Sequence, residues 1–306
     1  MSTDVFVIGS LNYDILIKQD RLPKLGETYY GNKLSMMPGG KGANQAVQCA
    51  KLGLSVKMLG CVGNDSFGDE LIHSFHVNHI DTQYIKRKNT TGVGVVNILN
   101  NGDYYSTIIK GANYALHVND VCNHFFTGNP LVILQSEIPS DVVNYAVQQA
   151  YEFKCPILLN NAPARSIRKD ILKKVNYLVV NETEASYMTN TLVDSVETAF
   201  TAARQLKEKI ISIVFITLGD KGSIMYDGKR IKHFSAVQCE HIVDTTGAGD
   251  SWIGAIAWAI LKGYNMDDGV NFASHVSAYT IRNYGGHNSF PTLKDVNPAI
   301  SVTKFK

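Results

Sequence analysis

The stretch HIVDTTGAGDSWIGA, residues 241–255, places two acids on either side of a glycine-rich loop where a helical pattern begins. The small residues at 247–249 leave backbone N–H groups uncovered, and uncovered N–H groups at a helix N-terminus favour a bound anion. A carboxylate beside a bound phosphate can accept the proton of an attacking hydroxyl, so Asp250 is a candidate general base for phosphoryl transfer. The alternative is that Asp244 or Thr245 caps the helix and Asp250 only complements its dipole.

A second glycine-rich loop, PGGKGANQ at residues 38–45, precedes another helical pattern. Neither loop is a Walker loop, because GxxxxGK[ST] is absent. Neither is a dinucleotide fingerprint, since Gln45 and Trp252 stand where the third glycine should be. The common nucleotide-binding loops are therefore excluded, and the pairing of amides with acids needs another explanation.

The composition excludes several other classes of function. The chain has 306 residues, 45% of them hydrophobic and 18% charged, which is ordinary for a globular protein with a substantial core. Its net charge of +2 comes from dispersed lysines and arginines, so nucleic-acid binding is not expected. The apolar runs are too short to span a bilayer, and no signal-peptide pattern opens the chain. Five scattered cysteines without a CxxC pair suggest reduced thiols in the cytoplasm.

The elements that must position these loops alternate along the chain. Buried strands are predicted over residues 5–9, 55–63, 131–135, 155–160, 176–181 and 212–219. Helices are predicted over residues 42–53, 65–77 with Asp65 as N-cap, 140–153 and 195–209. Strand and helix in alternation predict a largely parallel sheet covered on both faces.

Two regions break this alternation. Residues 12–34 are polar and strand-like, and residues 92–110 form a hairpin pattern that turns at 100–103. Neither is followed by a helical pattern, so we expect a small β-sheet standing off the main body. Its exposed edges would need cover, and pairing with a second subunit is one way to provide it.

The motifs of both loops resemble a known family. DTTGAGD resembles the C-terminal signature of the ribokinase-like carbohydrate kinases, and GGKGANQAV at 39–47 resembles their N-terminal signature. Further matches follow in order: GSLNYD (9–14), LGET (25–28), GND-FG (63–68), TGV (91–93), GAN (111–113), QSE (135–137), NAPA (161–164), NETEA (181–185) and ITLGDKG (216–222). The resemblance implies a single domain over residues 1–306. It further implies a ribokinase-like three-layer α/β/α fold with a mostly parallel central sheet and a small β-sheet lid formed by about 12–34 and 92–110.

The same resemblance implies catalytic and sugar-binding roles. Asp250 would be the general base, and the N–H groups of Gly247, Ala248 and Gly249 would form the anion hole. Carboxylates and amides suit neutral hydroxyls, and the ends of parallel strands are where such sheets bind ligands. The sugar-binding set would be Asn12, Asp14, Gly40, Lys41, Asn44, Glu137 and Asp250. Taken alone, Asp14 or Glu137 would be a solvated loop acid and Lys41 a surface lysine.

For the nucleotide, the resemblance implies a site built from the NETE and ITLGDKG motifs. Its residues would be Asn181, Glu184, Thr217, Gly219 and Gly222. Glu184 would organise Mg²⁺ through water, which suits an ion that keeps several of its waters. The alternative for NETE is a helix cap with an acidic first turn.

A monovalent cation, K⁺ in particular, is implied beside the anion hole. Its site would combine Asp244 with the carbonyl of Thr246 and with the later segment RNYGGHNSFP. From that segment would come the carbonyls of Asn283 and Gly285, together with Ser289. The alternative is that Asp244 is a simple N-terminal cap.

The function implied is an ATP-dependent kinase that phosphorylates the primary hydroxyl of D-ribose to D-ribose 5-phosphate, in a cytoplasmic homodimer joined through the lid. The alternatives are the same transfer to deoxyribose, a hexose, a sugar acid or a nucleoside, or a catalytically silent sugar or nucleotide sensor. Trp252, Asn161 and Asn97 depart from the family pattern or lie where a sugar contact is expected, so they bear on the substrate.

Overall fold

A nine-stranded sheet forms the centre of the protein in a computed structural model that describes residues 3–100 and 104–296. In order across the sheet, its strands are β13 (Ile231–Phe234), β12 (Ser223–Tyr226), β11 (Ile213–Thr217), β10 (Tyr177–Asn181), β9 (Ile157–Asn160), β8 (Leu131–Gln135), β1 (Val5–Ile8), β4 (Val56–Val62) and β5 (Ile85–Arg87). The strands from β11 to β5 pair in parallel, and β12 and β13 are antiparallel. The predicted, largely parallel sheet is confirmed.

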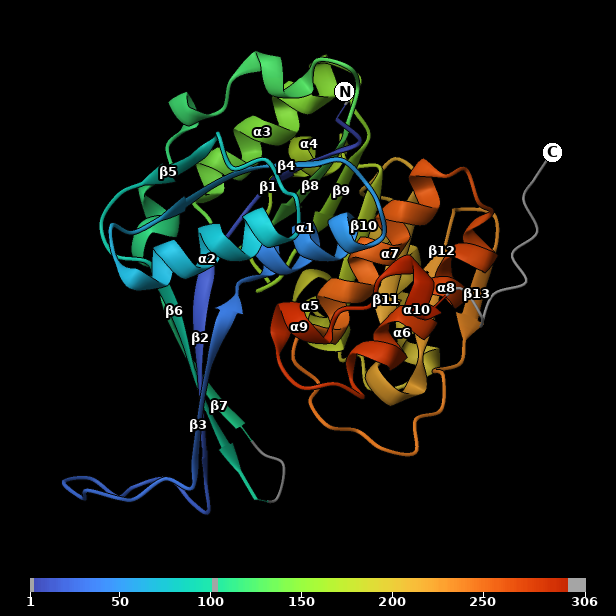
Figure 1. Cartoon of the computed structure of the whole chain (residues 1–306). Coiled ribbons are helices and arrows are strands. Elements are labelled where there is room, and N and C mark those ends of the chain that lie inside the picture. The colour runs from blue at the N-terminus through green and yellow to red at the C-terminus, as the bar shows by residue number, and fades with distance from the viewer. Residues whose placement is uncertain (1–2, 101–103, 297–306) are drawn as a thin grey trace.

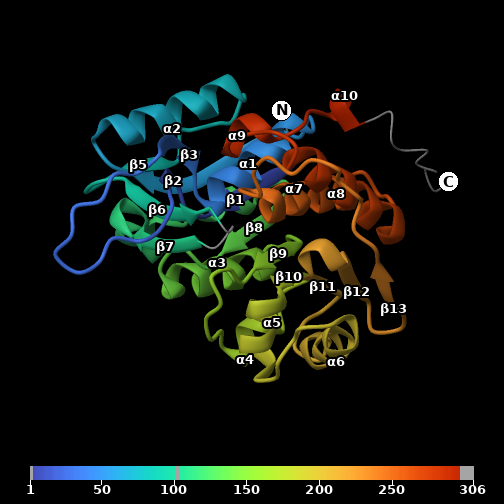
Figure 2. The same ribbon diagram turned by 90° about the horizontal axis from the view of Figure 1, so that it is seen from below.

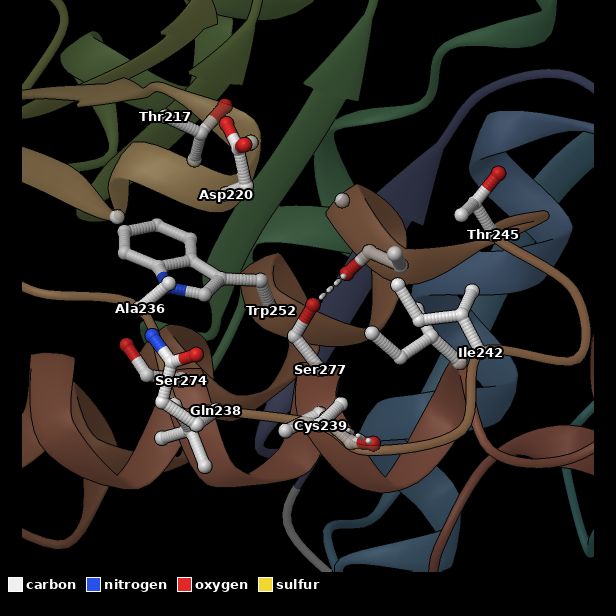
Figure 3. A pocket seen from close by; sticks show the side chains of 17 residues that line it. Thr217, Asp220, Ala236, Gln238, Cys239, Ile242, Thr245, Trp252, Ser274 and Ser277 are labelled. Atoms are coloured by element: carbon white, nitrogen blue, oxygen red, sulfur yellow. Dashed lines mark hydrogen bonds between the residues drawn. The ribbon is translucent and has the colours of Figure 1, made fainter. Parts of the chain in front are cut away.

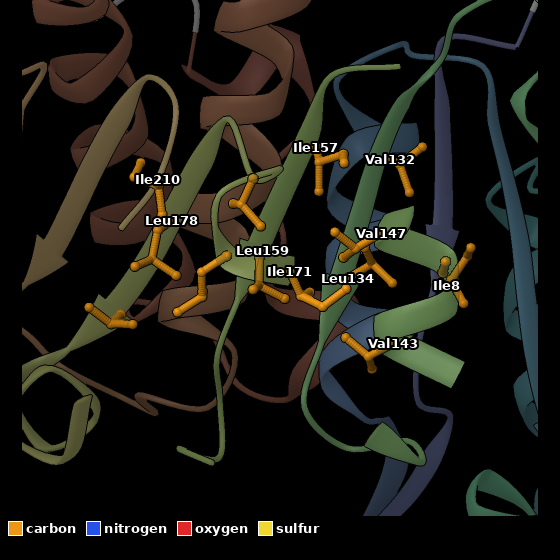
Figure 4. Packing of buried hydrophobic residues seen from close by; sticks show 14 of the residues in the cluster. Ile8, Val132, Leu134, Val143, Val147, Ile157, Leu159, Ile171, Leu178 and Ile210 are labelled. Atoms are coloured by element: carbon orange, nitrogen blue, oxygen red, sulfur yellow. The ribbon is translucent and has the colours of Figure 1, made fainter. Parts of the chain in front are cut away.

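Alternating side chains of the buried strands point to opposite faces of the sheet and pack into two separate apolar clusters. On β1, Phe6 and Ile8 join one apolar cluster, while Val5 and Val7 join the other. The first cluster is covered by α3 (Ser140–Glu152), α4 (Lys169–Leu172), α5 (Glu182–Thr189) and α6 (Val196–Lys207). The second is covered by α1 (Lys41–Lys51), α2 (Ser66–Val77), α7 (Ala248–Leu261) and α8 (Met266–Thr280). Figure 2 shows the helices on either side of the sheet, and Figure 4 shows side chains of the first cluster. The three-layer α/β/α fold is thus confirmed.

A second sheet projects from the main body (Figure 1). Its order is β3 (Lys33–Gly39), β2 (Asn12–Gln19), β6 (Gly92–Leu99) and β7 (Tyr104–Ile109). Two antiparallel hairpins are joined through the parallel pair β2 and β6, so the sheet is mixed. The expected small β-sheet is present. The segment predicted to end at residue 34 continues as β3 to Gly39. Of the predicted turn at 100–103, residues 101–103 lie outside the described residues.

Both glycine-rich loops lead into helices, as predicted. α1 begins at Lys41 directly after the first loop, and α7 begins at Ala248 within the second. Asp65 caps α2, because its carboxylate accepts the Gly68 N–H at 2.9 Å. No helix in the described part of the chain is both long and apolar enough to cross a membrane.

Candidate active site

The N-termini of α1 and α7 converge on Asp250. This residue is only 7% exposed, in the first turn of α7. Its two carboxylate oxygens accept hydrogen bonds from α1, one from Asn44 Nδ2 at 2.9 Å and one from Gln45 Nε2 at 2.8 Å. The predicted pairing of Asp250 with Asn44 in one site is therefore present, and Gln45 is an additional neighbour that the motif did not single out.

The start of α7 offers open backbone amides. Gly247 adopts the left-handed conformation at φ 78°, and the Ala248 N–H turns back to the Thr245 carbonyl at 3.2 Å. The amides of Gly247, Gly249 and Asp250 have no acceptor among the described residues. The expected row of three open amides is therefore corrected at Ala248, whose N–H closes a turn, while Asp250 contributes one of its own.

The first loop differs, because the amides at the start of α1, from Lys41 to Asn44, are already satisfied. Glu137 Oε2 accepts the Lys41 N–H at 3.1 Å and the Ser10 hydroxyl at 2.5 Å. The Gly42 N–H donates to Ser10 Oγ at 3.2 Å. Glu137 thus caps α1 from a loop far away in the sequence, and the first amides of this helix are not open to a ligand. Gly40, at φ 88°, packs against the backbone of Leu11 and Asn12, so closely that a Cβ there would lie 2.5 Å from the Asn12 nitrogen.

Lys41 stands at the centre of a group of acids. Burial lowers its pKa, but four nearby carboxylates outweigh burial and raise the pKa above its ordinary value. These carboxylates belong to Asp250, Glu137, Glu184 and Asp14. The ammonium group therefore remains charged at neutral pH and neutralises part of the acidic cluster.

Asp14 carries an unusual carboxyl group on lid strand β2. Burial raises its pKa to about 7, with Glu137 and Asp250 adding to the rise and Lys41 opposing it. The side chain fits closely against the backbone of both neighbouring strands, because a Cβ at Gly39 would lie 2.1 Å from Asp14 Oδ2 and one at Gly94 2.6 Å from Oδ1. A ligand that hydrogen-bonds this carboxylate would relieve its cost of burial.

Asp14→Asn should stabilise the unliganded protein by roughly 2 kcal/mol at pH 8 and by much less at pH 5. The reason is that the folded pKa lies above the ordinary value of 3.8, so the wild-type protein loses stability as pH rises towards 7 and the carboxyl ionises. Urea unfolding at both pH values measures this. Asp20→Asn is the control in the same lid, since the lowered pKa of Asp20 keeps it ionised across this range. Equal effects at both pH values would contradict the assignment for Asp14.

The base of the lid is tied by residues whose role the sequence did not reveal. Asn113 exchanges hydrogen bonds with the Leu11 backbone and donates Nδ2 to Asn12 Oδ1 at 2.6 Å. The Asp65 carboxylate accepts both the N–H and the hydroxyl of Thr91, where β6 begins. The buried Asn12 oxygen is therefore engaged in anchoring the lid. The GAN and TGV motifs were the only signal of these contacts.

Two neighbouring cavities open at the carboxyl ends of the strands. A cavity of about 260 Å³ is lined by Lys41, Asp250, the 247–249 backbone and Glu184. A larger cavity of about 430 Å³, shown in Figure 3, shares Thr217, Thr245, Ala248 and Gly249 with it. Because the two share these residues, one elongated ligand could occupy both.

The predicted nucleotide residues line these cavities. Gly219 and Gly222 line the larger one, Asn181 and Glu184 the smaller, and Thr217 both. Asn181 and Glu184 also form a reciprocal capping box on α5, with bonds of 2.8 and 2.9 Å, so the helix-cap alternative holds as well. Burial raises the pKa of Glu184, and the bond from Asn181 and the charge of Lys41 lower it only in part.

The residues predicted for a monovalent cation gather behind the α7 loop. Asp244 accepts the N–H groups of Thr246 at 2.9 Å and Gly285 at 3.2 Å. In the described residues, the carbonyls of Thr246 and Asn283 accept no hydrogen bond. The Gly285 carbonyl already accepts two amides of the short helix α9 (Gly286–Ser289), and the Ser289 hydroxyl donates to Gly286.

The two departures from the family pattern and the lid residue expected near the sugar have different surroundings. Trp252 lines the larger cavity (Figure 3). Its ring lies edge-on to that of Phe215, with the ring centroids 5.4 Å apart. Asn161 is fully buried and accepts the Ser136 hydroxyl at 2.6 Å; its neighbours Asn160 and Ala162 line the smaller cavity, but Asn161 itself does not. Asn97 accepts a bond from Gln19 at 3.2 Å and, by strand alternation, lies on the opposite face of β6 from Gly94. Of the three, only Trp252 borders a cavity.

Comparisons with known proteins agree with this geometry. A family model described as pfkB family carbohydrate kinase matches residues 2–293. Ribokinase of Bacillus subtilis (strain 168) is 32% identical over 97% of this chain and 99% of that protein. Deoxyribokinase of Salmonella typhi is also 32% identical, over 98% and 100%. The structure of Arabidopsis thaliana ribokinase complexed with ribose and ATP matches with a TM-score of 0.90 and 27% identity, over 99% of this chain and 100% of that one. The chain therefore belongs to the pfkB family of carbohydrate kinases.

Proposed function

We propose that this enzyme transfers the γ-phosphoryl group of ATP to the primary hydroxyl of D-ribose, giving D-ribose 5-phosphate. The observation that carries the proposal is the juxtaposition of a buried carboxylate, Asp250, with open amides at the start of α7, on the wall of a cavity. Ribokinase relatives 32% identical over nearly the whole chain support ribose as the substrate.

In this proposal each group has a defined task. Asp250 accepts the proton of the attacking hydroxyl, and the amides of Gly247 and Gly249 stabilise charge on the transferring phosphoryl group. Lys41 remains charged and lies on the same cavity, so it adds positive potential there. Asp14, Asn44 and Glu137 orient the sugar. Closure of the lid excludes water, which would compete as phosphoryl acceptor.

The nucleotide would extend from the smaller cavity into the larger. Its phosphates would face the open amides of Gly247 and Gly249, and its base would enter the larger cavity beside Trp252. Mg²⁺, when bound, would neutralise part of the negative charge of the phosphates. Glu184 fits an outer role towards this ion, because only its Oε2 is engaged by Asn181. K⁺ would be held by Asp244 with the carbonyls of Thr246 and Asn283, and would support the α7 loop from behind.

The lid offers a surface for a second copy of the chain. Its strands expose large apolar side chains, and β3 and β7 are open edges of the sheet. The exposed set is Leu34, Met36, Tyr105, Ile108 and Ile109. We include in the proposal a homodimer joined through the lid. We also propose a reducing, cytoplasmic setting, because the five cysteines are free.

Deoxyribose is the second candidate substrate, since a deoxyribokinase is 32% identical over 98% of this chain. Sugar acids and phosphosugars are disfavoured, because Lys41 is the only basic side chain on the described walls of the smaller cavity and its charge is matched by four carboxylates. A catalytically silent sensor is disfavoured, because Asp250 is retained beside the open amides of Gly247 and Gly249.

A coupled ADP-release assay tests the proposal. With ATP, Mg²⁺ and K⁺, D-ribose should give kcat/KM at least about tenfold above 2-deoxy-D-ribose, hexoses and nucleosides, because a site built to bind the missing hydroxyl discriminates strongly against its absence. Omitting K⁺ should lower the rate. If deoxyribose exceeds ribose, the substrate assignment is wrong while the family stands. If no sugar releases ADP, the enzymatic proposal itself fails.

A further inference from the structure

A chain of buried side-chain amides leads to the Asp250 carboxylate. Gln45, on α1, is fully buried. Its Nε2 donates to Asp250 Oδ1 at 2.8 Å and to Asn160 Oδ1 at 3.2 Å. Both of its amide protons are therefore engaged, one of them on the proposed base.

The orientation of this amide is fixed from behind. Gln45 Oε1 accepts Gln135 Nε2 at 2.7 Å, so turning the amide over would set oxygen against oxygen at Asp250 and nitrogen against nitrogen at Gln135. Asn160 is fixed as well, because its Nδ2 donates to the Val179 carbonyl at 3.0 Å. The chain of donors thus has a single direction that ends at the carboxylate.

The two amides on Asp250 are not equivalent. Asn44 donates to Oδ2, but its own Oδ1 is buried without a hydrogen-bond partner among the described residues. A buried oxygen without a donor favours a ligand hydroxyl at that point. Asn44 can therefore adjust when a sugar binds, whereas every polar atom of Gln45 is already committed. Only Gln45 holds Asp250 in the same place with and without substrate.

We propose that Gln45 is a positioning residue that fixes the orientation of the Asp250 carboxylate for proton transfer. The inference rests on the proposed role of Asp250 as the base. An amide donor on a carboxylate favours the charged form, so loss of the donor raises the pH at which the carboxylate takes up a proton. The charged groups facing Asp250 are Lys41 from α1, Asp14 from β2, Glu184 from α5 and Glu137 from the loop after β8.

The test compares pH profiles of kcat at saturating sugar and ATP. Gln45→Met keeps the volume of the side chain but removes both hydrogen-bond donors. It should lower kcat at pH 7 by about tenfold or more, and the acid limb, meaning the fall of kcat on the low-pH side of the profile, should move upward by about one pH unit. Gln45→Glu keeps an acceptor for Gln135 but sets a second carboxyl against Asp250, and should displace the limb at least as far. KM for ATP should change less than about twofold, since Gln45 is not among the residues that line either cavity.

Gln48→Met is the matched control, one turn along the same helix. Gln48 is equally buried, and its amide donates to the Pro291 carbonyl at 3.0 Å rather than to Asp250. The acid limb of the Gln48→Met pH profile should coincide with that of the wild-type enzyme. If both Gln45 variants keep the wild-type limb, or if Gln48→Met moves it equally, Gln45 is only a packing residue. If Asp250→Asn itself retains turnover, the proposed base is wrong, which is a different failure.

Discussion

Asp250→Asn should lower kcat by about a hundred- to ten-thousand-fold while sugar and ATP still bind within a few-fold of wild-type affinity. The asparagine keeps the size of the side chain but has no basic oxygen for the hydroxyl proton. The structure also accommodates the change. Asn44 Oδ1 lacks a partner, so a turned Asn44 could accept a bond from the new amide. Rates under saturating conditions, with binding measured by calorimetry, separate loss of chemistry from loss of binding.

Asp244→Asn is the control on the same loop. Its carboxylate holds the amides of Thr246 and Gly285 and does not line either cavity. This variant should keep measurable turnover whose level depends on K⁺ concentration. If Asp250→Asn loses less than tenfold in kcat, the proton goes elsewhere, and the juxtaposition of carboxylate and amides has another purpose. If Asp244→Asn is the more damaged variant, the two roles have been assigned the wrong way round.

The helix starts were predictable because they depend on neighbouring residues. The GAG triplet, the PGGKG loop and the Asp65 cap all act within one or two turns of their own helix, so a linear reading detects them. The alternation of apolar runs was likewise sufficient for the parallel sheet. The lid was predicted as a sheet, but β3 extends through SMMPG, where the Pro-Gly pair looked like the beginning of a loop.

The contacts that organise the site were not predictable in this way. Glu137 accepts the Lys41 N–H of α1 from 96 residues away, and Gln45 donates to Asp250 across 205 residues. These contacts between distant residues depend on which strands lie side by side in the sheet. The spacing of residues along the chain does not predict them. The same limit applies to Asn113 and Thr91, which the motifs flagged without indicating what they hold.

Gly247→Ala should lower kcat by about a hundred-fold or more and destabilise the fold by roughly 1–3 kcal/mol. Gly247 has φ 78°, where an L side chain is strained, and its added Cβ would lie 2.7 Å from the ring of Phe290. That ring is buried, and its backbone is held by Lys51, whose Nζ donates to the Phe290 carbonyl at 2.9 Å and to His287 at 2.6 Å. Because Phe290 cannot easily withdraw, the start of α7 must move.

Gly263→Ala separates backbone strain from displacement of the amides. Gly263 lies at the other end of α7 with φ 70°, yet a Cβ there meets nothing within 4 Å. It should cost about 1 kcal/mol of stability and leave kcat unchanged. Adding Phe290→Leu to Gly247→Ala should restore part of kcat, since it removes the colliding ring atoms but not the strained φ. Equal kcat losses in the two glycine variants, or no gain from the second substitution, would mean that the amides at 247–249 do not need the exact placement that Phe290 enforces.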